Sequence, residues 1–465
     1  MAAHTFTLLG SDSQKLHDHL FPGDGKEAVA IGLCTLSCSE NPVRILLKEI
    51  IPVPHDVCTM RSRVTVQWPF DWLDPIIKRA KDENLSIVKF HSHPDEIDEF
   101  SEMDDVSDSS LFDAISSYTD LDIPNASIIM LESGRMVGRI ILSNNEFHTL
   151  SKISILDRMP VFWAEKNDLT PKSSIGRNTK GFGAEMRQEL HNLSVAVIGV
   201  SGTGSIVAEQ LARLGVGRII LIDPDKIKEK NLDRILNANM SHARGEKYKV
   251  DVIKSSLDAL ESGTEIVAYN KQLTDISALK AAASCDFLFG CVDGAEGRSI
   301  MDRLASSQLQ ILIDVGVGIE ATEDGSVDQV DAAIHYIVPG GSSLLSRGVY
   351  TPEQVHAEKM KRVAPAEYEE QKKQKYIKGR DEEQPAVISL NMVASSNAVL
   401  EWLSRLYPFK NELNHNKFDT VRINLAESCI STNEERTPCP VMRKLLASGD
   451  RNPLLNLPEL TVRKK

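Results

Sequence analysis

The stretch Phe90-His-Ser-His-Pro-Asp-Glu-Ile-Asp-Glu-Phe-Ser-Glu-Met-Asp104 decides how the first part of this chain is interpreted. His91 and His93 stand two residues apart at the end of an apolar run, which predicts a β-strand. Residues i and i+2 on a strand point to the same face, so both imidazoles can reach one metal ion. Asp104 can supply a third ligand and leave a fourth position for water, which is the arrangement of a catalytic zinc site.

Ser101 stands one helical turn before Asp104 and therefore on the same side of any helix that begins there. The same Ser-x-x-Asp spacing is also an ordinary helix-capping pattern, with Ser at the N-cap and an acid at the third helical position. The acids from Asp95 to Asp105 could equally form a solvated face. Neither simple interpretation accounts for the histidine pair, the proline and the Ser/Asp pair together, so the sequence predicts a metal site.

The complete pattern, His-x-His-Pro, six residues, then Ser-x-x-Asp, resembles the motif of the JAMM (JAB/MPN-type) metalloproteases at every defined position. That family also uses a glutamate on an upstream strand. Glu27, at the start of an expected strand over residues 27–37, is the best placed, and Glu40 and Glu49 remain alternatives.

The resemblance implies an α+β domain in which His91, His93 and Asp104 bind Zn²⁺. Glu27 would take a proton from the water bound there, and Ser101 would donate a hydrogen bond to the oxyanion of the tetrahedral intermediate. Metalloproteases of this kind mostly cut amide or isopeptide bonds after the C-terminal Gly of ubiquitin-like proteins.

The overall composition is that of an ordinary soluble protein, with 42% hydrophobic and 26% charged residues. A net charge of −13 argues against a general nucleic-acid or anionic-membrane binder, because both need concentrated basic surface. Neither a signal peptide nor an apolar stretch of about 18 residues is evident. Seven scattered cysteines are typical of reduced thiols, so we expect a cytoplasmic protein.

The chain is expected to fold as two domains of the α/β class. Residues 1–163 form the first, and residues 164–190, which contain three glycines and Pro171, connect it to a second domain over 191–465. There, strands alternate with helices, which predicts a parallel sheet. The Lys- and Glu-rich segment 351–384 lacks an apolar stripe and is expected to be a solvated excursion, followed by an amphipathic helix near 389–406.

A second informative stretch is Val195-Ala-Val-Ile-Gly-Val-Ser-Gly-Thr-Gly204, a buried strand that runs into a glycine-rich loop. Gly199, Gly202 and Gly204 let the backbone approach a phosphate, and the following helix N-terminus favours negative charge. Asp223 ends the next strand, where a carboxylate binds ribose hydroxyls. Taken alone, this pattern fits a nicotinamide dehydrogenase nearly as well as an ATP enzyme, although its glycine spacing departs from the dinucleotide pattern.

Polar residues further along the chain favour an ATP-binding enzyme over a nicotinamide dehydrogenase. An adenylating enzyme needs cations for the β- and γ-phosphates and a carboxylate for Mg²⁺, whereas a hydride-transfer enzyme has little use for them. The residues that offer this chemistry are Asp225, Asn231, Arg234, Lys249 and Asp293. The simpler alternative is that Arg234, Lys249 and Asp293 are ordinary charged residues at loop ends with no role in ATP binding.

From about Arg177 to about Leu406 the chain resembles the ThiF/MoeB-like family, which includes the nucleotide-binding half of ubiquitin-activating enzymes. The resemblance implies a Rossmann-like adenylation domain with a mostly parallel sheet. It also implies a homodimer in which Arg177 or Lys180 reaches the ATP of the partner subunit. Lys230 departs from the Ser that is usual in the family.

By the same resemblance, each of the matching positions takes a role toward ATP and Mg²⁺. Asp223 would hold the ribose, and Asn231 and Arg234 the phosphates. Lys249 would contact the phosphates at the reacting centre, and Asp293 would bind Mg²⁺. The implied reaction is attack by the C-terminal Gly carboxylate of a protein on the α-phosphate, which gives an acyl-adenylate and pyrophosphate.

Many such enzymes pass the activated carboxylate to a cysteine. Cys439, between two prolines, is expected to be the most exposed candidate for a thioester, with Cys429 behind it. The loop over residues 339–348 lacks the cysteines that relatives often place there, so a second, structural zinc site is not expected.

Together the two resemblances imply a bifunctional enzyme that adenylates a ubiquitin-like protein and matures or deconjugates it. The alternative is activation of a sulfur-carrier protein for thiocarboxylate formation. A protease fused to a dehydrogenase would bind NAD instead of MgATP, and a non-enzymatic scaffold would bind neither zinc nor ATP. The sequence leaves open whether a separate conjugating enzyme acts downstream.

Overall fold

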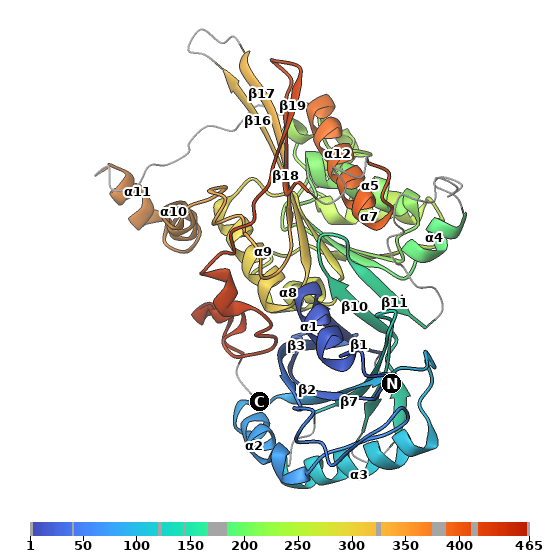
Figure 1. The fold of residues 1–465 in the computed structure, drawn as a ribbon. Helices are drawn as coiled ribbons and strands as arrows, with labels where there is room; N and C mark the ends of the chain where they lie inside the picture. Colours follow the sequence, from blue (N-terminus) through green and yellow to red (C-terminus); the bar gives the residue numbers. More distant parts are fainter. Residues whose placement is uncertain are drawn as a thin grey trace. The chain divides into compact units, whose positions relative to one another are not determined.

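The computed structural model describes residues 3–39, 41–119, 123–142, 146–165, 184–321, 327–373, 387–410 and 417–462. The chain forms two compact units, whose elements are labelled in Figure 1. Unit 1 comprises Met1–Thr170, Leu446–Leu454 and Val462–Lys465, and unit 2 comprises Pro171–Leu445 and Leu455–Thr461.

Unit 1 is built on a mixed nine-stranded sheet in the order β11-β10-β1-β3-β2-β6-β7-β8-β9. Its strands are β1 (His4–Leu9), β2 (Val29–Leu36), β3 (Val43–Pro52), β6 (Ser86–His93), β7 (Asn125–Leu131), β8 (Met136–Ile141), β9 (Phe147–Thr149), β10 (Lys152–Leu156) and β11 (Val161–Ala164). A separate two-stranded hairpin pairs β4 (Met60–Arg61) with β5 (Val66–Gln67).

Helices cover both faces of this sheet, because its central strands alternate apolar residues to either side. On β2, Ala30 belongs to the core that includes Leu16 of α1 (Gly10–Leu20), whereas Ile31 belongs to the core on the other face. That second core includes the apolar stripes of α2 (Asp74–Glu83) and α3 (Glu102–Thr119). The two faces of β2 thus separate α1 from α2 and α3, which pack on the opposite face of the sheet.

A short C-terminal segment belongs to unit 1, although the sequence pattern predicts that all of 191–465 belongs to the second domain. The hydroxyl of Thr35 donates a hydrogen bond to the carbonyl of Ala447 (2.9 Å), and the Asp450 N–H donates to the carbonyl of Leu36 (2.8 Å). These contacts lie at the end of β2 and involve residues more than 400 positions apart in the sequence, so local pattern could not indicate them.

Unit 2 contains an eight-stranded sheet in the order β14-β13-β12-β15-β16-β17-β18-β19. The strands β12 to β16 pair in parallel with one another, and β17, β18 and β19 each pair antiparallel with the strand before them. The strands are β12 (Ser194–Ile198), β13 (Arg218–Ile222), β14 (Glu265–Tyr269), β15 (Phe287–Gly290), β16 (Ile311–Ala321), β17 (Val327–Ile337), β18 (Thr420–Asn424) and β19 (Cys429–Asn433). The order reverses between β12 and β15, and ligands of such sheets bind at the carboxyl ends of the strands at that reversal.

The described helices of unit 2 are α4 (Ala184–Leu190), α5 (Gly202–Leu214), α6 (Met240–Arg244), α7 (Lys249–Asp258), α8 (Ile276–Ala283), α9 (Ala295–Ser307), α10 (Pro352–Val363), α11 (Pro365–Lys373) and α12 (Ile388–Leu406). The helix expected near 389–406 is therefore present as α12, and its Trp402 ring packs edge-on against Phe287 and Phe289 of β15. No helix of the described ranges is both long and apolar enough to cross a membrane.

The charged segment over 351–384 differs from expectation, because its described part forms α10 and α11. Polar contacts hold α10 in place where an apolar stripe is absent. Thr351 and Gln354 form a reciprocal capping box at the start of α10. The carboxylate of Glu358 accepts hydrogen bonds from the first two N–H groups of α9, at 2.9 and 2.8 Å. Residues 374–386 lie outside the described residues.

Replacing Gly204 by alanine is expected to destabilise unit 2. A Cβ at this position would lie 1.8 Å from the carbonyl oxygen of Gly199, so the loop between β12 and α5 must move. Forced overpacking of this kind costs about 1–3 kcal/mol. Thermal unfolding should detect the change. Gly318→Ala is the control for loss of a glycine in the same unit without crowding, since no atom lies within 4 Å of the place that its Cβ would take. Equal melting temperatures for Gly204→Ala and the wild type would contradict the prediction.

Candidate active sites

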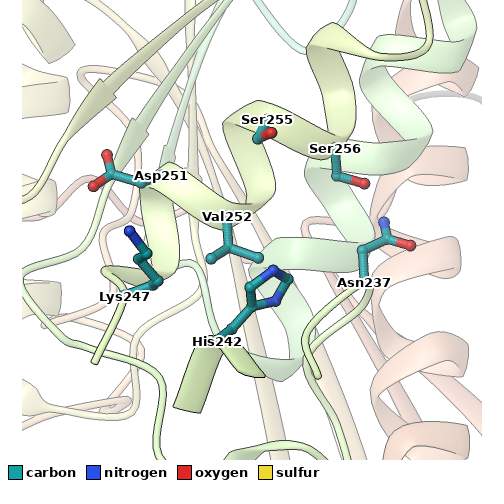
Figure 2. A pocket seen from close by; sticks show the side chains of 7 residues that line it. All are labelled: Asn237, His242, Lys247, Asp251, Val252, Ser255 and Ser256. Atoms are coloured by element: carbon teal, nitrogen blue, oxygen red, sulfur yellow. The ribbon is translucent and has the colours of Figure 1, made fainter. Parts of the chain in front are cut away.

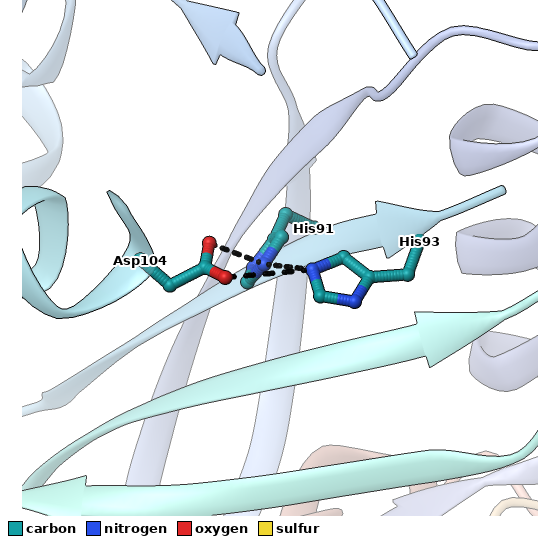
Figure 3. Close-up of side chains that lie close together, drawn as sticks. All are labelled: His91, His93 and Asp104. Atoms are coloured by element: carbon teal, nitrogen blue, oxygen red, sulfur yellow. Dashed lines mark hydrogen bonds and ion pairs between the residues drawn. The ribbon is translucent and has the colours of Figure 1, made fainter. Parts of the chain in front are cut away.

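The two histidines predicted to bind metal lie at the end of β6, in the interior of unit 1. Register pairing places His91 opposite Val29 on β2 and Ile129 on β7, so neighbouring strands on both sides hold it. His91 and His93 point to the same face, with their Nε2 atoms 3.2 Å apart (Figure 3). The sequence prediction of a shared face is therefore confirmed by the strand geometry.

Asp104 reaches both histidines from the first turn of α3. Its Oδ1 lies 3.0 Å from Nε2 of His91, and its Oδ2 lies 3.6 Å from Nε2 of His93. Burial raises the pKa of the Asp104 carboxyl, but the hydrogen bonds with His91 and His93 outweigh this and hold the pKa well below its usual range. Asp104 is therefore ionised at neutral pH.

Ser101 directly precedes α3 and forms the capping pattern with Asp104. The Asp104 N–H donates to Oγ of Ser101 (3.2 Å), and the Ser101 N–H donates to Oδ2 of Asp104 (2.8 Å). The Ser101 hydroxyl also donates to Oδ2 of Asp104 (2.7 Å). Helix capping and the metal-type cluster are thus not alternatives, because one Asp104 carboxylate takes part in both.

Glu27 lies just before β2 and is fixed through its backbone. Its N–H donates to the carbonyl of Ser62 (2.7 Å), and its carbonyl accepts from Nε of Arg61 (2.9 Å). Burial raises the pKa of the Glu27 carboxyl to about 7; the field of His93 opposes the rise and that of Asp104 adds to it. The carboxyl can therefore gain and lose a proton near neutral pH, as a general base must.

The alternative glutamates differ from Glu27. Glu49 is exposed and its Oε2 pairs with Nη1 of Arg79 at 2.7 Å. Glu40 lies outside the described residues. Of the two described candidates, Glu27 is the one whose carboxyl senses the charges of His93 and Asp104.

The donor set of His91, His93 and Asp104 fits a zinc ion. One ligand atom from each lies within 4.8 Å of the others. Burial lowers the pKa of His91 to about 4, so this imidazole is neutral at pH 7. Nδ1 of His93 lies 2.8 Å from the carbonyl of Ile97, which directs Nε2 toward the cluster, as in many zinc sites. Neutral imidazole and carboxylate are the ligands that zinc prefers.

In unit 2, the glycine loop follows β12 at the point where the strand order reverses. Gly199 has φ +86°, and a Cβ there would lie 2.5 Å from the carbonyl oxygen of Cys291, just beyond β15. The loop therefore closes tightly against the end of β15, and the N-terminus of α5 begins at Gly202. This arrangement suits a phosphate group.

Asp223 and Lys249 lie together beyond the end of β13. Both oxygens of the buried Asp223 accept backbone hydrogen bonds, from Val200 (2.7 Å) and from Asp225 (2.9 Å). Burial raises the pKa of Asp223, and the charge of Lys249 opposes the rise. Nζ of Lys249 lies 2.8 Å from Oδ2 of Asp225 and 3.5 Å from Oδ1 of Asp223. Three of the predicted nucleotide residues thus form one cluster.

Asn231 and Arg234 lie in and after a short 3₁₀ helix, η2 (Glu229–Asn231). The Asn231 side chain accepts from the Lys228 N–H (3.1 Å), and the Arg234 guanidinium donates to the carbonyl of Lys230 (3.2 Å). A Cβ on Gly202 would lie 3.4 Å from Cδ of Arg234, so this arginine borders the glycine loop.

Asp293 is exposed in the loop between β15 and α9, two residues after Cys291. It is therefore on the same edge of the sheet as the glycine loop. Arg177 and Lys180 lie outside the described residues, so their predicted role toward the partner's ATP stays a prediction.

Asn391 of α12 lies at the glycine loop although no sequence motif indicates it. It is buried, and its Nδ2 lies 2.2 Å from the position that a Cβ on Gly202 would take. The amide thus lies directly against the glycine loop. In the sequence it is one polar residue in an amphipathic helix 189 positions away (391 − 202), and no local signal connects it to the loop.

The expectation of an exposed Cys439 is wrong. Its exposed fraction is 2%, and it packs with Met442, Leu445 and Leu345 in a small apolar cluster. The Cys439 N–H also donates a hydrogen bond to the carbonyl of Gly341 (2.9 Å), which fixes the backbone of this cysteine in its buried position. Cys429, at the start of β19, is exposed.

A surface depression of about 430 Å³ lies elsewhere in unit 2, beside α6 and α7 (Figure 2). Its lining residues are Asn237, His242, Lys247, Asp251, Val252, Ser255 and Ser256. None of them belongs to the predicted nucleotide set, so the depression carries no assignment.

Comparisons with known proteins find two different domains in this chain. Residues 12–137 match a family model described as prokaryotic homologs of the JAB domain. A segment of 167 residues is 29% identical to ubiquitin-like modifier-activating enzyme 5 of Bombyx mori and covers 34% of this chain and 40% of that protein. A segment of 99 residues is 40% identical to tRNA threonylcarbamoyladenosine dehydratase of Bacillus subtilis (strain 168) and covers 21% of this chain and 38% of that protein.

These matched segments span well under half the length of either relative. Among solved structures, E. coli MccB with MccA-N7isoASN is similar at 20% identity with a TM-score of 0.43, over 56% of this chain and 71% of that chain. The model of the ThiF family matches residues 175–441, which is more than half of the sequence. The chain belongs to the ThiF family and carries a JAB-like domain ahead of its ThiF domain.

Proposed function

We propose that the chain is a bifunctional enzyme of a ubiquitin-like protein pathway. Unit 2 adenylates the C-terminal Gly of a ubiquitin-like protein with MgATP, and unit 1 cleaves a peptide or isopeptide bond after that Gly with zinc. One observation supports this above all. A His91/His93/Asp104 set, with both histidines buried and the titratable Glu27 beside it, shares a chain with a ThiF-family domain.

In unit 1, His91, His93 and Asp104 would hold the zinc. When bound, the ion lowers the pKa of water and polarises a carbonyl. Glu27 takes the proton of the attacking water and delivers it to the leaving amine, for which a pKa near 7 is suited. The Ser101 hydroxyl, which donates to Oδ2 of Asp104 in this structure, would turn to donate its hydrogen bond to the oxygen that gains negative charge.

In unit 2, backbone N–H groups of the glycine loop and the N-terminus of α5 face the phosphates of ATP. Asp223 would hold the ribose, and the Asn231 amide would donate a hydrogen bond to a phosphate. Arg234 and Lys249 would neutralise phosphate charge, and Asp293 would bind Mg²⁺. A carboxylate oxygen of the protein substrate bonds to the α-phosphorus as the bond to pyrophosphate breaks. In this structure Nζ of Lys249, which has three N–H donors, pairs with Asp225.

The fate of the acyl-adenylate separates two candidate pathways. Conjugation through a thioester needs an accessible cysteine, and Cys439 is buried while Cys429 is exposed. The burial of Cys439 leaves Cys429 as the carrier candidate of these two. The second candidate pathway needs no such cysteine: a sulfur-carrier protein is activated, and a sulfur donor of the hydrosulfide class displaces AMP from the adenylate to give a thiocarboxylate. A reducible protein adduct that disappears in Cys429→Ala would instead support conjugation.

Glu27→Gln is expected to lower peptide cleavage by about 10²- to 10⁴-fold, the usual contribution of general acid–base catalysis. Zinc content should stay at about one ion per chain, because Glu27 is not among the three ligands. The measurement is cleavage of a fluorogenic amide attached to the C-terminal peptide of a ubiquitin-like protein. Glu49→Gln is the matched control, since Glu49 pairs with Arg79. Cleavage at the wild-type rate in Glu27→Gln would remove this residue from the mechanism.

A further inference from the structure

A buried ion pair lies directly beside the predicted zinc ligands. Lys89 stands two residues before His91 on β6, and Asp108 stands four residues after Asp104 on α3. Their side chains meet, with Nζ of Lys89 2.6 Å from Oδ1 of Asp108. The exposed fractions are 3% and 0%, so both charges are removed from water. An ion pair this deep is costly to form and is poorly explained by stability alone.

The spacing of this pair matches the spacing of the ligands. Two residues along a strand advance about 6.6 Å, and four residues along a helix advance about 6 Å. His91–Asp104 and Lys89–Asp108 therefore form two successive cross-links between β6 and an antiparallel α3. A shift of α3 by one residue would break the ion pair and withdraw Asp104 from the histidines.

Arg139 of β8 holds the same turn of α3 from another side. Its Nη2 lies 2.8 Å from Oδ2 of Asp108, and it also pairs with Asp105. Its guanidinium is enclosed between the rings of Phe100 and Phe147, at 3.8 and 3.9 Å from their centroids. The Phe100 ring in turn lies 6.2 Å from that of His91. Arg139 therefore contacts Phe100, before Asp104 in the sequence, as well as Asp105 and Asp108, after it.

We propose that Lys89, Asp108 and Arg139 are positioning residues that set the register of α3 on β6 and so present Asp104 to the metal together with His91 and His93. The inference rests on the proposed metal site. Preorganisation by buried partners is what a ligand set on two separate elements requires, and loss of such outer partners typically costs about 10- to 100-fold in metal affinity.

The test is zinc affinity of full-length Lys89→Met, measured by competition with a chelator, with the Co²⁺ absorption spectrum as a report on the ligand set. Asp108 keeps Arg139 as a partner in this variant, so the fold should persist, and circular dichroism of the metal-free protein checks it. We expect zinc to bind about 10- to 100-fold more weakly. Lys48→Met, which removes a surface ion pair with Glu83 in the same unit, is the matched control and should bind zinc like the wild type.

A thermodynamic cycle with Asp104→Ala separates positioning from general damage. In this background only the two histidines remain as ligands, and they bind zinc too weakly to keep it through dialysis, so affinity is measured by direct titration with excess Zn²⁺. If Lys89 acts through Asp104, Lys89→Met should change zinc affinity less than about twofold once Asp104 is absent. Equal losses in both backgrounds would overturn the inference, and so would wild-type affinity in folded Lys89→Met. A wild-type protein that binds no zinc would overturn the proposed protease function itself, which is a distinct outcome.

Discussion

His93→Ala is expected to reduce bound zinc from about one ion per chain to nearly none and to abolish peptide cleavage. His93 supplies one of three ligands, and its Nε2 is directed to the cluster by the contact of Nδ1 with Ile97. Two remaining ligands do not form the three-ligand set of a catalytic zinc site. Metal analysis of the dialysed protein measures the effect.

His148→Ala is the matched control for the loss of a histidine from unit 1. His148 lies on β9, outside the ligand cluster, 3.7 Å from a carboxylate oxygen of Glu146. Its replacement should leave zinc content at the wild-type level. Unchanged zinc in His93→Ala would show that the ion, if present, binds elsewhere, and the assignment of unit 1 as a metalloprotease would fail.

Asp293→Ala is expected to lower ATP–pyrophosphate exchange by at least about a hundredfold, as the loss of one electrostatic contact to a reacting centre usually does. The assay uses a ubiquitin-like protein that ends in Gly as the carboxylate donor. Asp293 is exposed on the sheet edge that carries the glycine loop, so its removal should leave the fold intact while Mg²⁺ loses its carboxylate.

Asp258→Ala, at the end of α7, is the control for the loss of an exposed carboxylate from unit 2. It should exchange pyrophosphate like the wild type. Full exchange in Asp293→Ala would exclude this residue as the magnesium ligand. No exchange in the wild type, with the same protein still cleaved by unit 1, would make proteolysis the main activity and leave the nucleotide fold without a catalytic role.

Sequence pattern predicted the parts of both sites that depend on local spacing. The His91/His93 pair follows from strand periodicity, and the turn that carries Asp104 follows from its capping pattern with Ser101. The glycine loop likewise follows from its position between a buried strand and a helix. These features need only a few consecutive residues, and the structure has each of them in the expected element.

Features that depend on distant residues were missed for a common physical reason. Lys89 and Asp108 are ordinary charges in the sequence, and only the register of α3 on β6 brings them together. Cys439 is flanked by prolines, yet it is buried because Leu345, almost one hundred residues earlier, packs on it. Similarly, α10 is held by the cap that Glu358 provides to α9 rather than by an apolar stripe of its own.

The return of Leu446–Leu454 to unit 1 affects how the two activities can be separated. A nascent chain that has not yet reached this segment lacks the Thr35–Ala447 hydrogen bond, so unit 1 is completed only after most of unit 2 has been synthesised. A single proteolytic cut between the units likewise cannot release an intact unit 1, because one of its pieces remains attached to the other fragment. Point variants, rather than truncated chains, are therefore the appropriate means of assigning each reaction to its unit.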